Sequence, residues 1–335
     1  MNILYLIGNG FDVAQGLKTR YPDFYGSYKQ TAPINDEERR IIASIDNNVE
    51  KWSDMEVALG VFTKEVNSAA GFIDAYESLS SKLSIYLKGQ DEYYRPDNIE
   101  RYRKELANPF EDLSYPEAIS FNKYVSSFGE KKASIDVISF NYTNVFERAI
   151  GYEYQAVALE GPFFPEGVSL NRVYKIHGSL QGTIVMGVND AGQIANDAFA
   201  KNQDVCDMIV KPQTNAVMGL GFDILSGEMI SAADLIIVYG MSIGETDRVW
   251  WQRIAERMAS PSVRMIIFYH LDEQVPPDKG WRVGRIQRMV KERFENISSV
   301  PEELREEMEK RIYVSTKGFM FNPNVVKFKP ENNSF

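Results

Sequence analysis

The feature that most constrains the fold is a set of short apolar runs that recur at both ends of the chain. They cover residues 3–7, 135–140, 173–176, 235–239 and 263–269. Each run has the length of a β-strand and is largely continuous instead of alternating with polar residues. Strands buried on both faces have this pattern, which is typical of a parallel sheet covered by helices. The sequence therefore predicts an α/β fold built on a parallel sheet.

The stretch between the first two runs, residues 22–132, carries almost no strand signal and several helical ones. Residues 54–59 follow a capping residue, Ser53, and in residues 70–87 apolar side chains recur mostly every three to four positions, as on one face of a helix. We therefore expect a sheet domain formed by residues 1–21 plus 133–335, and an inserted helical region at residues 22–132.

The charge balance narrows the classes of partner. The 335 residues include 47 acidic and 37 basic side chains, for a net charge of −10. This charge disfavours non-specific attraction to nucleic-acid phosphates or to an anionic membrane surface. We expect a small molecule or a protein as the partner, and neither nucleic acid nor membrane.

Cysteine and histidine are too scarce for a disulfide or a structural zinc site. Cys206 is the single cysteine, and His177 and His270 are the two histidines, so no metal centre is expected. The first apolar run spans five residues with no basic segment before it, which is too short for a signal peptide or a membrane span. These features predict a cytoplasmic protein.

A pair of glycines stands directly after the first predicted strand, in the run Gly8-Asn9-Gly10-Phe11-Asp12. Glycine lets a phosphate approach the backbone closely, and the amides of the turn and of the following helix can donate to it. Because two glycines are fewer than the full dinucleotide fingerprint requires, a tight turn without a ligand is the alternative. Asp12 can cap the helix or contact a ribose, and capping is the commoner role.

Polar residues also close the second and third predicted strands. Asn141 follows the run that ends at residue 140, and His177 follows the run that ends at residue 176. In open α/β sheets ligands bind beyond the carboxyl ends of the strands, so Asn141 is a candidate to position a ligand and His177 a candidate base. The alternatives are an Asx turn that starts a helix at residues 145–150, and a packed structural histidine.

The strand at residues 235–239 is followed by Gly240-Met241-Ser242-Ile243-Gly244 and then by Asp247. Ser242 can bind a phosphate or a ribose, and Asp247 can cap the next helix. The run also matches the GxSxG nucleophile elbow of α/β-hydrolases. In those enzymes an acid and then a histidine follow the serine, and only His270 stands after Ser242, so a serine hydrolase is the weaker interpretation.

Four motifs in this order resemble the AbiH family of bacterial abortive-infection (anti-phage) proteins, over nearly the whole chain. They are Gly8-Asn9-Gly10-Phe11-Asp12, Trp52-Ser53-Asp54-Met55-Glu56, Ser139-Phe140-Asn141-Tyr142-Thr143 and Ile176-His177-Gly178-Ser179. The resemblance implies an anti-phage effector.

The glycine turn, the asparagine strand end, the His-Gly pair and the later Gly-x-Ser also look like the motif order of sirtuin-like NAD-binding domains. This more distant resemblance implies a Rossmann-like sheet that takes NAD or a related nucleotide as ligand or substrate, without a prosthetic group. It implies hydrolysis of the nicotinamide N-glycosidic bond by water. The residues that it assigns to catalysis are His177 as base and Asn141 at the nicotinamide ribose. Those that we expect to bind the nucleotide are Gly8, Asn9, Gly10, Phe11, Asp12 and Ser242.

The chain also departs from that pattern. Thr143 stands where sirtuin-like sequences carry an acid, and the zinc-binding cysteines of sirtuin deacylases are absent, so protein deacylation is not expected. Glu56, in the helical insert, is either an acid supplied to the site or a surface or interface carboxylate. A non-catalytic nucleotide-binding switch stays open beside the hydrolase, with a phage component or a second copy of the chain as candidate partners. The acidic balance and the single candidate histidine disfavour a nuclease.

Overall fold

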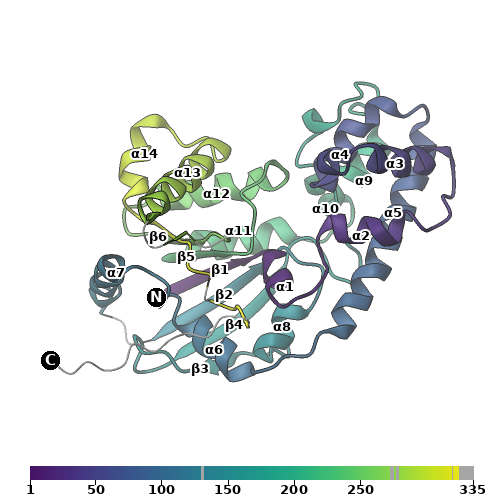
Figure 1. Ribbon diagram of the computed structural model, residues 1–335. Helices are drawn as coiled ribbons and strands as arrows, with labels where there is room; N and C mark the ends of the chain where they lie inside the picture. The colour runs from purple at the N-terminus through teal and green to yellow at the C-terminus, as the bar shows by residue number, and fades with distance from the viewer. Residues whose placement is uncertain (130–131, 272–274, 277–278, 319, 324–335) are drawn as a thin grey trace.

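The computed structural model describes residues 1–129, 132–271, 275–276, 279–318 and 320–323. The predicted sheet domain extends to residue 335, and residues 324–335 lie outside the described residues. In the described part a seven-stranded sheet has the order β3-β4-β2-β1-β5-β6-β7 (Figure 1). The strands are β1 Asn2–Ile7, β2 Ala133–Ser139, β3 Val157–Leu159, β4 Val168–Lys175, β5 Leu235–Tyr239, β6 Arg264–Phe268 and β7 Ile312–Ser315.

All neighbouring strands pair in parallel except β3, which is antiparallel to β4 at one edge. Numbered in chain order, the six parallel strands stand in the order 3-2-1-4-5-6, which is that of doubly wound sheets. In such sheets the strand order reverses between the first and fourth strands, here β1 and β5, and ligands bind at that point. The five predicted strands are confirmed. The strands β3 and β7, of three and four residues, were not predicted.

The helices account for most of the remaining described chain. They are α1 Gly10–Ala14, α2 Tyr21–Tyr28, α3 Asp36–Asn47, α4 Met55–Phe62, α5 Ala69–Tyr93, α6 Ile99–Ala107, α7 Tyr115–Ser127, α8 Val145–Ile150, α9 Gln203–Ile209, α10 Lys211–Val217, α11 Phe222–Ala232, α12 Arg248–Met258, α13 Trp281–Ile297 and α14 Glu302–Glu309. Short 3-10 turns occupy Val49–Trp52, Thr63–Glu65, Ala191–Gln193 and Glu245–Asp247. None of these helices is both long and apolar enough to span a membrane.

The predicted helices at residues 54–59, 70–87 and 145–150 correspond to α4, α5 and α8. The cap of α4 is Asp54, whose side chain accepts hydrogen bonds from the amides of Glu56 and Val57. The predicted cap at Ser53 is therefore wrong by one residue. The Asp54 carboxylate satisfies two of the free amides of the first turn.

Helices cover both faces of the sheet, as the continuous apolar runs predict. On one face, Tyr5 and Ile7 of β1 pack with aromatic and aliphatic side chains of α6, α7 and α8. On the other face, Leu4 and Leu6 pack with side chains of α11, α12, α13 and α14. Because successive side chains of one strand enter opposite cores, every position of β1 from 3 to 7 is apolar.

A third core lies beside the sheet, in a helical lobe formed by α2, α3, α4, α5, α9 and α10 (Figure 1). Its buried side chains come from residues 24–87, from Tyr142 and from residues 180–210. The predicted insert at residues 22–132 is helical, but the cores divide it. Its last helices, α6 and α7, pack on the sheet, while α9, from far beyond residue 132, joins the lobe. Two distant stretches of the chain thus build the lobe together.

The turns after β1 and β5 pack backbone against backbone. The Gly10 amide donates to the Gly240 carbonyl oxygen at 2.8 Å, and the Gly8 amide donates to the Tyr239 carbonyl oxygen at 2.9 Å. A Cβ atom on Gly240 would lie 2.6 Å from the Phe11 nitrogen, and Gly240 has a φ of +68°. A side chain at position 240 would therefore force the two turns apart.

We expect Gly240→Ala to lower the free energy of unfolding by roughly 2–4 kcal/mol, through the clash with the first turn and the left-handed backbone. Gly89→Ala is the matched control. Gly89 is exposed in α5 with no atom within 4 Å of the added Cβ, so alanine there stabilises the helix by about 0.5–1 kcal/mol. Chemical denaturation measures both values, and an unchanged midpoint for Gly240→Ala would contradict the close approach.

Candidate functional site

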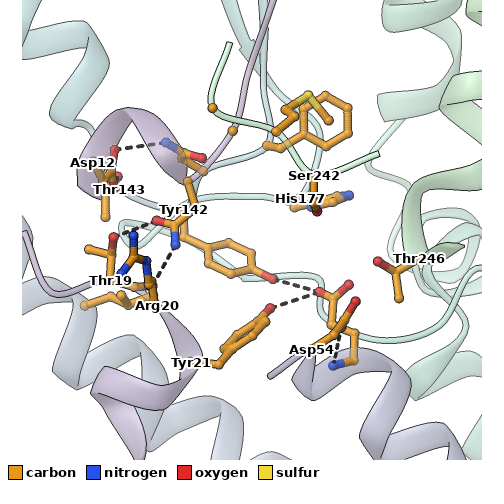
Figure 2. A pocket seen from close by; sticks show the side chains of 18 of the residues that line it. Asp12, Thr19, Arg20, Tyr21, Asp54, Tyr142, Thr143, His177, Ser242 and Thr246 are labelled. Atoms are coloured by element: carbon orange, nitrogen blue, oxygen red, sulfur yellow. Dashed lines mark hydrogen bonds between the residues drawn. The ribbon is translucent and has the colours of Figure 1, made fainter. Parts of the chain in front are cut away.

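A cavity of about 460 Å³ opens at the carboxyl ends of β1, β2, β4 and β5, where the sheet meets the helical lobe (Figure 2). Its volume lies within the usual range of ligand sites, roughly 300–1,000 Å³. The sheet supplies the turn after β1, residues 140–143 after β2, His177 after β4 and residues 240–242 after β5. The lobe supplies residues 19–22, the start of α4 and two leucines of α5. The cavity therefore lies at the reversal point between β1 and β5.

Asp12, Asn141 and Thr143 form one hydrogen-bonded group on the sheet side of the cavity. Asn141 Nδ2 donates to Asp12 Oδ1 at 2.9 Å, and the Thr143 hydroxyl donates to Asp12 Oδ2. Asn141 is only 5% exposed, and its Oδ1 has no hydrogen-bond partner among the described residues. Because Asp12 fixes the orientation of the amide, this oxygen is a buried acceptor left without a donor.

Burial raises the pKa of the Asp12 carboxyl from 3.8 to about 7, although hydrogen bonds from Thr143 and Asn141 and the charge of Lys175 act in the opposite direction. Lys175 forms a buried ion pair with Glu147 at 2.9 Å, and its ammonium donates to the carbonyl oxygens of Asn141 and Thr143. The Lys175 ammonium therefore fixes the backbone of the segment after β2. The Asp12 carboxyl can change protonation near neutral pH.

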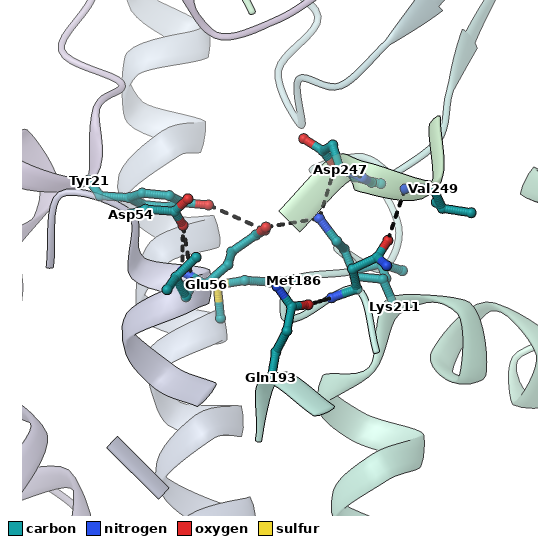
Figure 3. Close-up of polar contacts among 12 residues, drawn as sticks. Tyr21, Asp54, Glu56, Met186, Gln193, Lys211, Asp247 and Val249 are labelled. Atoms are coloured by element: carbon teal, nitrogen blue, oxygen red, sulfur yellow. Dashed lines mark hydrogen bonds and ion pairs between the residues drawn. The ribbon is translucent and has the colours of Figure 1, made fainter. Parts of the chain in front are cut away.

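A chain of charged groups crosses from the lobe to the sheet on the other side of the cavity (Figure 3). Glu56 Oε2 lies 2.9 Å from Lys211 Nζ, which lies 3.0 Å from Asp247 Oδ1. The same oxygen of Asp247 lies 3.3 Å from His177 Nε2. The hydroxyls of Tyr21 and Tyr142 both donate to Glu56 Oε1, at 3.4 and 3.5 Å. Glu56 and Lys211 are each 5% exposed.

Burial alone would favour the neutral forms of these groups, but their mutual attraction prevails. The carboxylates of Asp247 and Glu56 raise the pKa of Lys211 above its usual value, against the effect of burial. Burial also opposes the charge of Asp247, yet the Lys211 ammonium and His177 hold the pKa of that carboxyl well below its usual range. Burial and the neighbouring Glu56 raise the pKa of Asp54 to about 6. The ion pairs are therefore formed at neutral pH.

Residues 4–269 match the family described as Bacteriophage abortive infection AbiH. The chain belongs to the AbiH family. No curated protein matches it. The AbiH description refers to bacteriophage abortive infection, and membership suggests a role in that process.

Six of the eight predicted site residues of this AbiH chain line the one cavity: Gly8, Asn9, Asp12, Asn141, His177 and Ser242. Asn9 is engaged with Thr19, whose hydroxyl donates to Asn9 Oδ1 at 2.6 Å. Gly10 instead meets Gly240. Phe11 is fully buried in the core of the sheet, with its ring 5.2 Å from that of Phe146. Phe11 therefore supports the turn from behind and does not face a ligand.

The amides of this turn do not form the phosphate cradle expected of the glycine pair. Gly8 and Gly10 donate to the backbone after β5, and the Phe11 amide donates to the Gly8 carbonyl oxygen at 3.0 Å. The helix that follows, α1, has five residues. The glycines serve the close approach of two turns, so a phosphate in this cavity would need donors other than the amides of Gly8, Gly10 and Phe11.

Both predicted capping roles are wrong. Asp12 lies inside α1, after the cap position Asn9, and its carboxyl accepts from the segment after β2. Asp247 occupies the cap position of α12 but its side chain makes no capping hydrogen bond, because it pairs with Lys211 and His177. Glu56 is buried in the same network, so it is not a surface carboxylate. The Asx turn that was the alternative for Asn141 is not formed, because Asn141 Oδ1 accepts no hydrogen bond from the described residues.

The nucleophile-elbow geometry is not present at Ser242. That motif requires a sharp turn directly between a strand and a helix, whereas Ser242 lies in an extended stretch three residues before the 3-10 turn Glu245–Asp247. His270, the histidine that the hydrolase order requires, is exposed at the end of β6. Ser242 remains a lining residue of the cavity.

Sequence reasoning missed Tyr21, Tyr142, Lys211 and the single lining guanidinium, Arg20. Only Tyr142 carried a signal, because it belongs to the polar run after β2. Within the described residues, no group of three or more His, Cys, Asp or Glu side chains is arranged to hold a metal ion.

We expect Asp12→Asn to remove a destabilisation that grows with pH. Because folding raises this pKa from 3.8 to about 7, the folded protein keeps a proton that the unfolded chain has released, and stability is lost as the pH rises between those values. From about pH 5 to about pH 8 the variant therefore gains roughly 2–3 kcal/mol of unfolding free energy relative to the wild type. Chemical denaturation across this range measures the gain.

Asp74→Asn is the control, since Asp74 is an exposed carboxylate on α5. Its stability relative to the wild type should not change with pH over the same range. If the difference between Asp12→Asn and the wild type were also independent of pH, the buried carboxyl would not titrate as described.

Proposed function

We propose that this AbiH protein is an anti-phage effector that binds a nucleotide in the cavity and hydrolyses NAD at the nicotinamide N-glycosidic bond. The observation that carries the proposal is the convergence of Asp12, Asn141 and His177 on one cavity at the reversal point of a doubly wound sheet. Rossmann-like sheets bind dinucleotides at this point.

The hydrogen-bonding groups of the cavity support a ribose beside Asn141. The unpartnered Oδ1 of Asn141 requires a donor, and a ribose hydroxyl is one. Thr143, which stands where sirtuin-like sequences carry an acid, donates to Asp12. Asp12 thus brings a carboxyl to this spot from the turn after β1, which supports the sirtuin-like reading of the site.

The charges of the cavity support a ligand that carries both phosphates and a cation. Arg20 and Thr19 lie on one side of the cavity and Asp54 on the other (Figure 2), and Glu56 and Asp247 also line it. The guanidinium of Arg20 can pair with a phosphate. The carboxyl groups favour a pyridinium ring and the positive charge that develops on the ribose as the glycosidic bond lengthens.

The reaction needs a positioned water and a proton acceptor. Water attacks C1′ of the nicotinamide ribose while the C1′–N1 bond breaks. The electron pair of the broken bond returns to N1 and neutralises the pyridinium ring, so nicotinamide leaves without a proton. His177 accepts the proton of the attacking water, and the products are nicotinamide, ADP-ribose and one proton released to solvent. Holding ribose and water in this geometry is the main contribution of the site.

A second candidate function is a nucleotide-binding switch without turnover. It is favoured by the composition of the cavity wall, because the lobe supplies Arg20, Tyr21 and Glu56 among other residues while the sheet supplies Asn141 and His177. A nucleotide that touches both parts would change how firmly they hold together.

We expect purified protein incubated with NAD to release nicotinamide and ADP-ribose, measured by chromatography. His177→Ala should lower release about 100-fold or more through loss of the base, and Asn141→Ala at least about 10-fold through loss of ribose positioning. His270→Ala is the matched control, because it removes the other histidine, which is exposed, and should leave release unchanged.

Calorimetric titration with NAD separates the two candidates. Binding without release, both in the tube and in cells challenged with phage, would leave the switch and reject the hydrolase. Release that persists in His177→Ala would reject the assigned base, and the absence of binding would reject both functions.

A further inference from the structure

Lys211 has no role in the binding or the reaction described so far. It begins α10, and its amide donates to the Val188 carbonyl oxygen at 2.9 Å. Its ammonium does not line the cavity. It lies behind the wall, between Glu56 of the lobe and Asp247 of the sheet (Figure 3).

The environment of His177 makes the position of Asp247 decisive. His177 Nε2 is buried and makes no well-aligned hydrogen bond within the described residues, so Asp247 Oδ1, at 3.3 Å, is the acceptor within reach. The titratable groups that face the imidazole are Asp247 from the loop after β5 and Tyr142 from the segment after β2, whose ring centre lies 6.5 Å away. Lys211 contacts Asp247 and Glu56 contacts Lys211, so both act on the imidazole through Asp247.

We propose that Lys211 is the positioning residue of His177: anchored by Glu56 of the helical lobe, it holds and neutralises Asp247, so that His177 stays neutral with its proton on Nε2 and Nδ1 free for the cavity. The base can accept a proton only in this form. Without the ammonium, the buried Asp247 carboxylate would take the imidazole as its cation, and a protonated imidazole is no base. This inference rests on the proposed role of His177, and its test has a readout that needs no activity.

The test compares Glu56→Gln with the double variant Glu56→Gln/Lys211→Met. The single variant keeps the Lys211–Asp247 pair. The double variant removes the cation without leaving two carboxylates facing each other, which a lone Lys211→Met would do. Because the chain has two histidines, nitrogen-15 NMR of histidine-labelled protein, with His270→Ala for assignment, reports the protons on each ring nitrogen of His177.

At about pH 7.5, above the ordinary histidine range, we expect one proton, on Nε2, in the wild type and in Glu56→Gln. We expect protons on both nitrogens in the double variant. Nicotinamide release should fall about 100-fold from Glu56→Gln to the double variant, and this comparison cancels any effect of the Glu56 carboxylate itself.

Two results would overturn the inference. One is a wild-type proton on Nδ1, which needs no variant to observe. The other is an imidazole in the double variant that matches that of Glu56→Gln. If the NMR result is as expected but the wild type releases no nicotinamide, the positioning role of Lys211 stands and the hydrolase proposal fails.

Discussion

The architecture of the site depends on three charges in direct contact, the buried Glu56 and Lys211 and the partly buried Asp247. Removing such charges from water costs several kcal/mol for each ion, and only close pairing offsets that cost. The three come from α4, from the start of α10 and from the turn before α12, with Glu56 and Lys211 separated by 155 positions and Lys211 and Asp247 by 36. The pairing therefore forms only when lobe and sheet have assembled, and the cavity between them is a property of the complete fold.

The sheet explains why the polar groups collect where they do. Both of its faces are apolar and covered by helices, so side chains with chemistry can only stand at the ends of the strands. At the reversal between β1 and β5, successive helices leave to opposite faces and the loops diverge. The backbone contact between these two turns, made by glycines, leaves the space above them open as the cavity. The segments after β2 and β4 place Asn141 and His177 at the side of this cavity.

This geometry also decides what the sequence could reveal. Asn141, His177 and Ser242 were predicted from local pattern, because the carboxyl ends of parallel strands meet at one edge whatever the intervening loops do. The capping roles of Asp12 and Asp247 were wrong for the converse reason. Local statistics favour a capping role for each aspartate. Asp12 instead accepts hydrogen bonds from Thr143 and Asn141, and Asp247 pairs with the Lys211 ammonium. These stronger partners come from distant elements. Lys211 could not be predicted, since its function lies entirely in two long-range contacts.

The contribution of the lobe bears on how the two candidate functions are related. Because Glu56 holds the ammonium that neutralises Asp247, a movement of the lobe away from the sheet would alter the charge next to His177 as well as the shape of the cavity. A ligand that contacts Arg20 or Tyr21 and also Asn141 would oppose that movement. The two proposed functions therefore depend on the same contact between lobe and sheet, and they differ only in whether a water molecule beside His177 could reach a bound nucleotide.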